Sequence, residues 1–132
     1  MEQNYRRTAT TVSMVNFHFV FCPRYRRKVF KIDGFEARFK ELVIQICERN
    51  NIEILAMECH IDHVHLFVNA PPAISAADIM RLIKSNTSRV LLAEYSHIIK
   101  TPSLWTRSYF VSTAGNVSSD TIARYVATQK TR

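Results

Sequence analysis

Three of the five histidines of the chain lie within six positions of one segment, CHIDHVHLFVNA (residues 59–70). The apolar residues of this segment alternate as in a strand, so the side chains of His63 and His65 should share one face while Val64 and Leu66 turn toward the core. Imidazole nitrogens bind several divalent metals. The pair therefore indicates a metal site, and the alternative is a half-exposed polar strand that binds no metal.

Two polar neighbours extend this candidate site. His60 and Asp62 are close enough in sequence to orient the ligand rings through hydrogen bonds, and Asp62 could instead approach the ion itself. Burying so many polar groups is costly unless each finds a partner, which favours a site in which all of them take part. Two imidazoles alone do not distinguish zinc, manganese, nickel or a magnesium ion whose other ligands are oxygens.

A second pair of residues that could do chemistry lies near the end of the chain. Tyr125 and Gln129 are four residues apart in TIARYVATQKTR (residues 121–132), a segment whose pattern predicts a short helix, so they should be neighbours on one helical face. A tyrosine on such a helix usually packs against a core. Beside a metal ion, however, its phenol could become a nucleophile, and the amide oxygen of Gln129 could be a further ligand.

The segments around these residues predict strands and helices in a regular order. Strand patterns cover residues 10–23, 51–60, 63–70 and 103–113, and helical patterns cover residues 33–50, 75–95 and 121–132. The order β α β β α β α predicts an α+β fold, an antiparallel sheet with helices packed on it, as one domain over residues 1–132. Asp33 is expected to cap the first helix, and Ser75 with Asp78 the second.

The two middle strands should form a hairpin that presents the histidines. In the first of them, Ile52, Ile54 and Ala56 are expected on one face, and Glu53 and Leu55 on the other. The histidine segment would then follow directly after a short turn.

The charge of the chain points to a polyanionic partner. Its formal net charge is +7, and nucleic acid is the polyanion that a small basic protein most readily meets. Basic residues gather in the loop RYRRK and on the outer face of the second predicted helix, although either set could simply be solvated. The candidates for DNA contact are Arg24, Tyr25, Arg26, Arg27, Lys28, Lys84 and Arg89. Tyr25, Trp105 and Tyr109 could stack on bases, with packing favoured for Trp105.

Other classes of protein are disfavoured by what the sequence lacks. It has no apolar run long enough to span a membrane and no signal peptide at its start, so we expect a cytoplasmic protein without a membrane partner. Its three cysteines show no C-x-x-C spacing and are expected to be reduced. With two glycines, a glycine-rich phosphate loop is excluded.

Several motifs together resemble a known family. HIDHVHLFV, followed by a distant helix with YVATQ after SYFVSTAGNVSSDTI, is similar to the single-tyrosine HUH transposases of small bacterial and archaeal insertion sequences, including the REP-associated, hairpin-recognising type. CPRYRRKVF, LIKSNTSRVL and LWTRSYF occur in the expected order. His-x-His alone is a weak motif, but the ordered combination is specific. The resemblance implies a ferredoxin-like, RRM-like HUH fold, in which His63, His65 and Gln129 bind the metal and Tyr125 is the nucleophile.

The resemblance also implies an activity. Such an enzyme cleaves and rejoins single-stranded DNA, folded into hairpins at the ends of the element, through a covalent 5′-phosphotyrosine, with Mg²⁺ or Mn²⁺ as the ion. It would work as a homodimer with joined sheets, in which Gly115 could be the pivot of the tyrosine helix. Two alternatives remain open: a non-catalytic ferredoxin-like nucleic-acid-binding module, which leaves the histidines unexplained, and a metal-dependent phosphoesterase that uses water, which gives Tyr125 no role.

Overall fold

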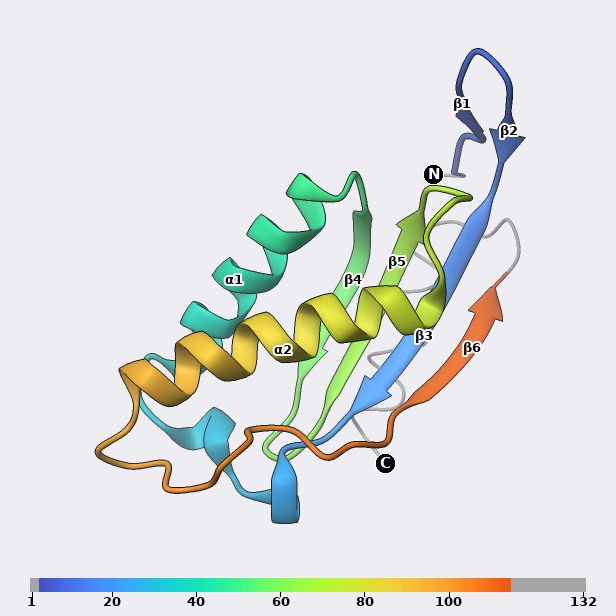
Figure 1. The fold of residues 1–132 in the computed structure, drawn as a ribbon. Helices are drawn as coiled ribbons and strands as arrows, with labels where there is room; N and C mark the ends of the chain where they lie inside the picture. The colour runs from blue at the N-terminus through green and yellow to red at the C-terminus, as the bar shows by residue number, and fades with distance from the viewer. Residues whose placement is uncertain (1–2, 115–132) are drawn as a thin grey trace.

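A four-stranded antiparallel sheet, in the order β4-β5-β3-β6, organises residues 3–114, the part of the chain that the computed structural model describes (Figure 1). The strands are β1 (Arg6–Arg7), β2 (Val12–Ser13), β3 (Val15–Phe21), β4 (Glu53–Cys59), β5 (Val64–Ala70) and β6 (Phe110–Ala114), and the helices are α1 (Phe35–Arg49) and α2 (Ala76–Glu94). Both helices cover one face of the sheet (Figure 1). The succession β3-α1-β4-β5-α2-β6 has the ferredoxin-like arrangement. The predicted fold is therefore confirmed through its sixth element, and the helix expected at 121–132 lies outside the described residues.

The helix-covered face of the sheet carries the main core. Phe19 and Phe21 of β3 and Val64, Leu66 and Val68 of β5 are at most 1% exposed and belong to one apolar cluster. Because side chains alternate along a strand, the residues between them point to the opposite face. The prediction that Val64 and Leu66 turn toward the core is thus confirmed, and the same alternation directs His65 away from the helices.

Helix α2 begins with the predicted capping box. The Ser75 hydroxyl accepts a hydrogen bond from the Asp78 backbone N–H (3.0 Å), and the Asp78 carboxylate accepts one from the Ser75 N–H (3.5 Å). Replacing Ser75 with alanine should lower the free energy of unfolding by about 1 kcal/mol, because the Asp78 N–H loses its acceptor. Urea denaturation measures this change. Ser85→Ala, inside the exposed part of the same helix, is the matched control and should leave stability nearly unchanged.

The predicted cap of α1 is wrong. The helix begins at Phe35, its N-cap position is Gly34 rather than Asp33, and no side chain caps it. The Phe35 N–H instead donates to the carbonyl of Ile32 (3.0 Å), the residue that follows the 3-10 turn Val29–Lys31. Gly34 occupies the left-handed region (φ 79°), where a residue without Cβ is favoured. A backbone acceptor therefore replaces the carboxylate that the sequence suggested.

The first predicted strand, residues 10–23, is divided in the structure. Only Val15–Phe21 joins the main sheet, while Val12–Ser13 pairs with Arg6–Arg7 in a separate two-stranded ribbon. Figure 1 shows this ribbon projecting beyond the end of the sheet. β1 was not predicted, because two residues are too few to show a strand periodicity.

The fourth predicted strand, residues 103–113, is too long. Ladder pairing begins only at Phe110, and the preceding residues form a loop. Trp105 in this loop is 4% exposed, and its indole N–H donates to the Thr87 hydroxyl of α2 (2.9 Å). Its aromatic character therefore reflects packing in the core, and the possibility that Trp105 stacks on a base is excluded by its burial.

A register irregularity in β4 changes the face on which one residue lies. The ladder between β4 and β5 shifts between Ile54 and Ala56. Ile54 packs against the main core, whereas Leu55 and Ala56 pack against Phe67 on the opposite face. The expectation that Ala56 shares a face with Ile54 is wrong, because an extra residue in a strand reverses the alternation after it.

Two further expectations concern membranes and cysteines. Neither helix in the described part of the chain combines the length and apolarity that crossing a bilayer requires. Cys22, Cys47 and Cys59 are free thiols, and burial raises the pKa of the Cys47 thiol to about 12. Cys47 is therefore a protonated core residue rather than a reactive thiolate.

Candidate metal centre

The turn between β4 and β5 brings three histidines together. One ring nitrogen from each of His60, His63 and His65 lies within 4.8 Å of those of the other two. The backbone N–H of His60 donates to the backbone carbonyl of His63 (2.8 Å), which closes the hairpin. The rings of these two residues are stacked, with centroids 4.2 Å apart. The His65 ring lies 5.3 and 5.2 Å from them. The two predicted ligands, His63 and His65, are thus adjacent in space. His60, which was expected to orient them, also lies within the cluster.

Asp62 fixes the orientation of His63. Its Oδ1 lies 3.0 Å from His63 Nδ1, and because a carboxylate can only accept, His63 carries its proton on Nδ1 and leaves Nε2 for an ion. The other carboxylate oxygen accepts a hydrogen bond from Arg26 Nε (3.2 Å). Hydrogen bonds from His63 and then Arg26 lower the pKa of Asp62. The expected orienting role of Asp62 agrees with this geometry.

His18 of β3 orients His65 and was missed by the sequence analysis. Its Nε2 lies 3.1 Å from His65 Nδ1, and its ring stacks on Phe67 with centroids 4.1 Å apart and planes at 2°. His18 is 5% exposed. When His65 Nδ1 donates to His18, Nε2 of His65 is available to an ion. A lone histidine within the apolar run NFHFVF was the signal that could have revealed it.

Burial keeps the imidazoles of His65 and His18 neutral. Desolvation lowers the pKa of His65 to about 4, with smaller contributions from His18, His63 and His60. Desolvation also lowers the pKa of His18. Only the neutral imidazole has a lone pair for a metal, so at neutral pH His65 is in the form that ligation requires.

The donor set fits a divalent cation. Metal–nitrogen distances of about 2.0–2.1 Å place the nitrogens of neighbouring ligands about 3.3 Å apart, so the three imidazoles, whose ring nitrogens lie within 4.8 Å of one another, would draw closer on binding one ion. The Nδ1 atom of His63 is already hydrogen-bonded to Asp62, and that of His65 to His18. This division between an oriented nitrogen and an available one is typical of metal-binding histidines.

The contact between His18 and His65 predicts an effect on metal affinity. His18→Phe keeps a ring that can stack on Phe67 but removes the acceptor for His65 Nδ1, so affinity for Mn²⁺ should fall by about 10–100-fold. Isothermal titration calorimetry measures this change. His97→Phe, at an exposed position outside the cluster, is the matched control. Equal Mn²⁺ affinity in both variants would contradict the orienting role.

The basic loop lies next to the metal cluster. Tyr25 and Arg26 adopt positive φ (61° and 51°), and the Tyr25 side chain is 76% exposed. Arg26 joins the loop to the cluster through Asp62, and the Arg24 guanidinium donates to the Ser103 hydroxyl (3.0 Å). Arg27 and Lys28 are exposed. The loop therefore presents an aromatic ring and free basic groups beside the histidines, as DNA contact would require.

Lys84 and Arg89, the two residues of α2 predicted to contact DNA, have different surroundings. Arg89 is exposed, whereas the Lys84 ammonium donates to the backbone carbonyls of Thr106 (2.6 Å), Arg107 (3.4 Å) and Ser108 (3.4 Å). Burial lowers the pKa of Lys84. Its charge thus holds the loop before β6, and its contact with DNA stays a prediction. Tyr125, Gln129 and Gly115 lie outside the described residues, so their predicted roles stay predictions as well.

A family model identifies the class to which the ferredoxin-like sheet and its histidine cluster belong. The model, described as "Transposase IS200 like", matches residues 11–129. The chain belongs to this family of IS200-like transposases.

Individual relatives agree with this result. The transposase of insertion sequence IS200 from Salmonella typhimurium is 31% identical over 102 residues, which are 75% of this chain and 66% of that protein. The ISDra2 transposase TnpA of Deinococcus radiodurans is 26% identical over 121 residues, 89% of this chain and 86% of its own length. The chain thus spans about two-thirds of the length of the Salmonella relative.

Solved structures show the same fold. A transposase candidate from Deinococcus radiodurans R1 superposes with a TM-score of 0.75 at 26% identity, covering 94% of this chain and 97% of that one. A REP-associated tyrosine transposase bound to a REP hairpin superposes with a TM-score of 0.61 at 16% identity, over 87% of this chain and 64% of that one. The second likeness concerns the fold alone.

Proposed function

We propose that this chain, as a single catalytic domain, cleaves and rejoins single-stranded DNA by metal-assisted transesterification through a covalent phosphotyrosine. The observation that carries the proposal is the cluster of His60, His63 and His65, with two rings oriented by neighbours, in a member of the IS200-like transposase family. A binding module would need no such cluster. The family membership in turn supports a nucleophilic role for Tyr125.

The metal would be held by His63 and His65, with His60 in reach and Gln129 as a further ligand. When bound, a divalent ion would polarise the scissile phosphate and stabilise the charge that develops on it. Three imidazoles are a more nitrogen-rich set than Mg²⁺ prefers, so of the two ions expected, Mn²⁺ suits the cluster better.

Tyr125 would be the nucleophile of the reaction and would hold the 5′-phosphate. The phenol of Tyr125 gives up its proton to solvent as its oxygen attacks the phosphorus in line, the bond from phosphorus to the 3′-oxygen breaks, and that oxygen takes up a proton from solvent and leaves as a 3′-hydroxyl. The 5′-phosphate stays esterified to the tyrosine. Because the phosphodiester energy is retained in this link, another 3′-hydroxyl can attack it and rejoin the strand without ATP.

The DNA would approach across the basic loop. Tyr25, exposed and held in the left-handed region, is placed to stack on an unpaired base, and Arg27 and Lys28 to contact phosphates. Arg24, Arg26 and Arg89 would add to this surface. The hairpin bound by the REP-associated relative supports a hairpin end of the element as substrate here.

The homodimer would use an edge of the sheet. Within residues 3–114, β6 lies at an edge of the sheet, and its Phe110 and Val111 are 53% and 37% exposed. An apolar edge with unpaired backbone groups is a template for pairing with another chain. We therefore place the dimer contact at β6, and sedimentation velocity measures whether the chain is a dimer.

A single gel tests the proposed function. The protein is incubated with a labelled hairpin oligonucleotide and Mn²⁺, denatured, and separated by size. A transposase of this mechanism gives a labelled protein adduct that resists denaturation. A phosphoesterase that uses water gives free fragments only, and a binding module gives neither, so either of these results would overturn the proposal.

A further inference from the structure

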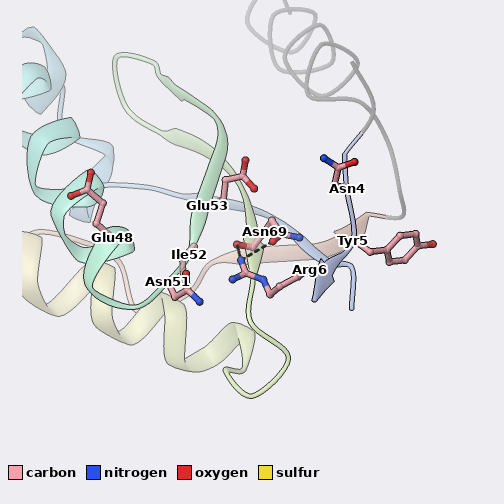
Figure 2. A pocket seen from close by; sticks show the side chains of 8 residues that line it. All are labelled: Asn4, Tyr5, Arg6, Glu48, Asn51, Ile52, Glu53 and Asn69. Atoms are coloured by element: carbon pink, nitrogen blue, oxygen red, sulfur yellow. Dashed lines mark hydrogen bonds between the residues drawn. The ribbon is translucent and has the colours of Figure 1, made fainter. Parts of the chain in front are cut away.

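A cavity of about 490 Å³ lies at the end of β5 away from the histidine cluster (Figure 2). Its walls come from the N-terminal segment with Arg6, from the end of α1 and the following turn with Glu48 and Asn51, and from the strand ends with Glu53 and Asn69. The volume falls within the range of about 300–1,000 Å³ typical of small-ligand sites. Its polar lining has no role in the function proposed above.

The floor of the cavity is a fixed hydrogen-bond network. The Arg6 guanidinium donates through Nη2 to Asn69 Oδ1 (2.7 Å) and to the Asn69 carbonyl (3.3 Å), as Figure 2 shows. The Asn69 amide donates in turn to Asn16 Oδ1 (2.9 Å). Arg6 Nε is buried and has no hydrogen-bond partner among the described residues. Because Nε is shielded from solvent and Nη2 already donates to Asn69, a ligand would reach Arg6 through the N–H groups of Nη1.

The rim of the cavity carries acceptors. Glu48 and Glu53 are exposed, and neither carboxylate takes part in an ion pair within residues 3–114. Two carboxylates disfavour a phosphate, whereas they would accept N–H donors readily. The ligand that matches an arginine donor on the floor and carboxylate acceptors on the rim is a neutral group with both acceptors and donors. Nucleobases have such edges.

We propose that this cavity is a base-binding subsite for single-stranded DNA and that it prefers guanine. Guanine O6 or N7 would accept from Arg6 Nη1, while its N1–H and N2–H groups would donate to the two carboxylate oxygens of Glu53. An unpaired base exposes both edges at once, as this arrangement requires. The inference rests on the proposed function, because it assumes a single-stranded DNA substrate.

The position of the cavity suits a nucleotide near the reacting phosphate. Asn69 follows His65 by four positions, a distance of about 13 Å along β5. That corresponds to about four nucleotides at the rise of a stacked strand. The subsite would therefore read a base close to the cleavage position rather than a distant part of the hairpin.

Fluorescence anisotropy with the full chain tests the subsite. The probes are a labelled oligothymidylate and the same oligonucleotide with one guanine. Wild type should bind the guanine probe about tenfold more tightly. Glu53→Gln and Arg6→Gln should lose this preference, while Glu36→Gln, which removes the same charge at the far end of α1, should keep it.

The outcomes separate this inference from the proposed function. Equal affinity of wild type for the two probes, or a preference unchanged in Glu53→Gln, would overturn the subsite and leave the transposase mechanism intact. Binding of neither probe would also overturn the subsite, whereas absence of the adduct with the hairpin oligonucleotide would overturn the proposed function itself. Because Glu53 is exposed and Arg6 takes part in the network around Asn69, Glu53→Gln decides the matter if Arg6→Gln does not fold.

Discussion

Tyr125→Phe should abolish the covalent protein–DNA adduct and leave DNA binding unchanged. The substitution removes only the phenolic oxygen, which is the atom that would form the bond to phosphorus, and keeps the aromatic ring. The adduct gel measures the first effect. Anisotropy with the same hairpin measures the second, so loss of chemistry is distinguished from loss of substrate.

The control for this prediction is another tyrosine. Tyr25→Phe removes the same oxygen from the exposed basic loop and should still give the adduct, because its ring can continue to stack on a base. An adduct that persists in Tyr125→Phe and disappears in Tyr25→Phe would transfer the nucleophilic role to the loop. An adduct that persists in both would leave the assignment of Tyr125 without support.

His65→Ala should nearly eliminate both Mn²⁺ binding and cleavage. His65 is the most buried of the three clustered histidines, and its ring is oriented by His18, so its loss removes an imidazole that is already positioned. The loss in affinity should exceed the effect of about 10–100-fold expected when only an orienting partner is removed. Calorimetry with Mn²⁺ gives the affinity, and the adduct gel gives the activity.

His97→Ala serves as the control for this second variant, because His97 is exposed and lies outside the cluster. Circular dichroism establishes that His65→Ala keeps its secondary structure. If folded His65→Ala binds Mn²⁺ as wild type does, the three histidines do not form the metal centre. If it loses the metal but still forms the adduct, the chemistry does not need the ion.

The sheet and the face of the histidine pair were predictable because they depend on local periodicity. Alternation along 63–70 correctly directed Val64 and Leu66 to the core, and helical spacing located α1 and α2 within two residues at each end. Local patterns failed where the chain departs from regular geometry. The irregularity after Ile54 depends on backbone pairing between strands, and the start of α1 depends on a backbone hydrogen bond from Phe35 to Ile32, neither of which residue types indicate.

The rest of the candidate site depends on contacts between distant segments. His18 reaches His65 across 47 residues, through the pairing of β3 with β5, and single-sequence periodicity carries no such information. Arg26 meets Asp62 for the same reason. Trp105 shows the opposite case, since the core packing that its residue type favoured is confirmed by its burial.

The histidine cluster is built almost entirely within one tight hairpin, with consequences for how it could assemble. Closing a loop of a few residues costs little chain entropy, so His60, His63 and His65 can meet as soon as β4 pairs with β5. The partner on β3 arrives only with a long-range contact, which forms more slowly. Assembly of the centre would thus proceed in two stages, first gathering the ligand rings and later fixing their tautomers.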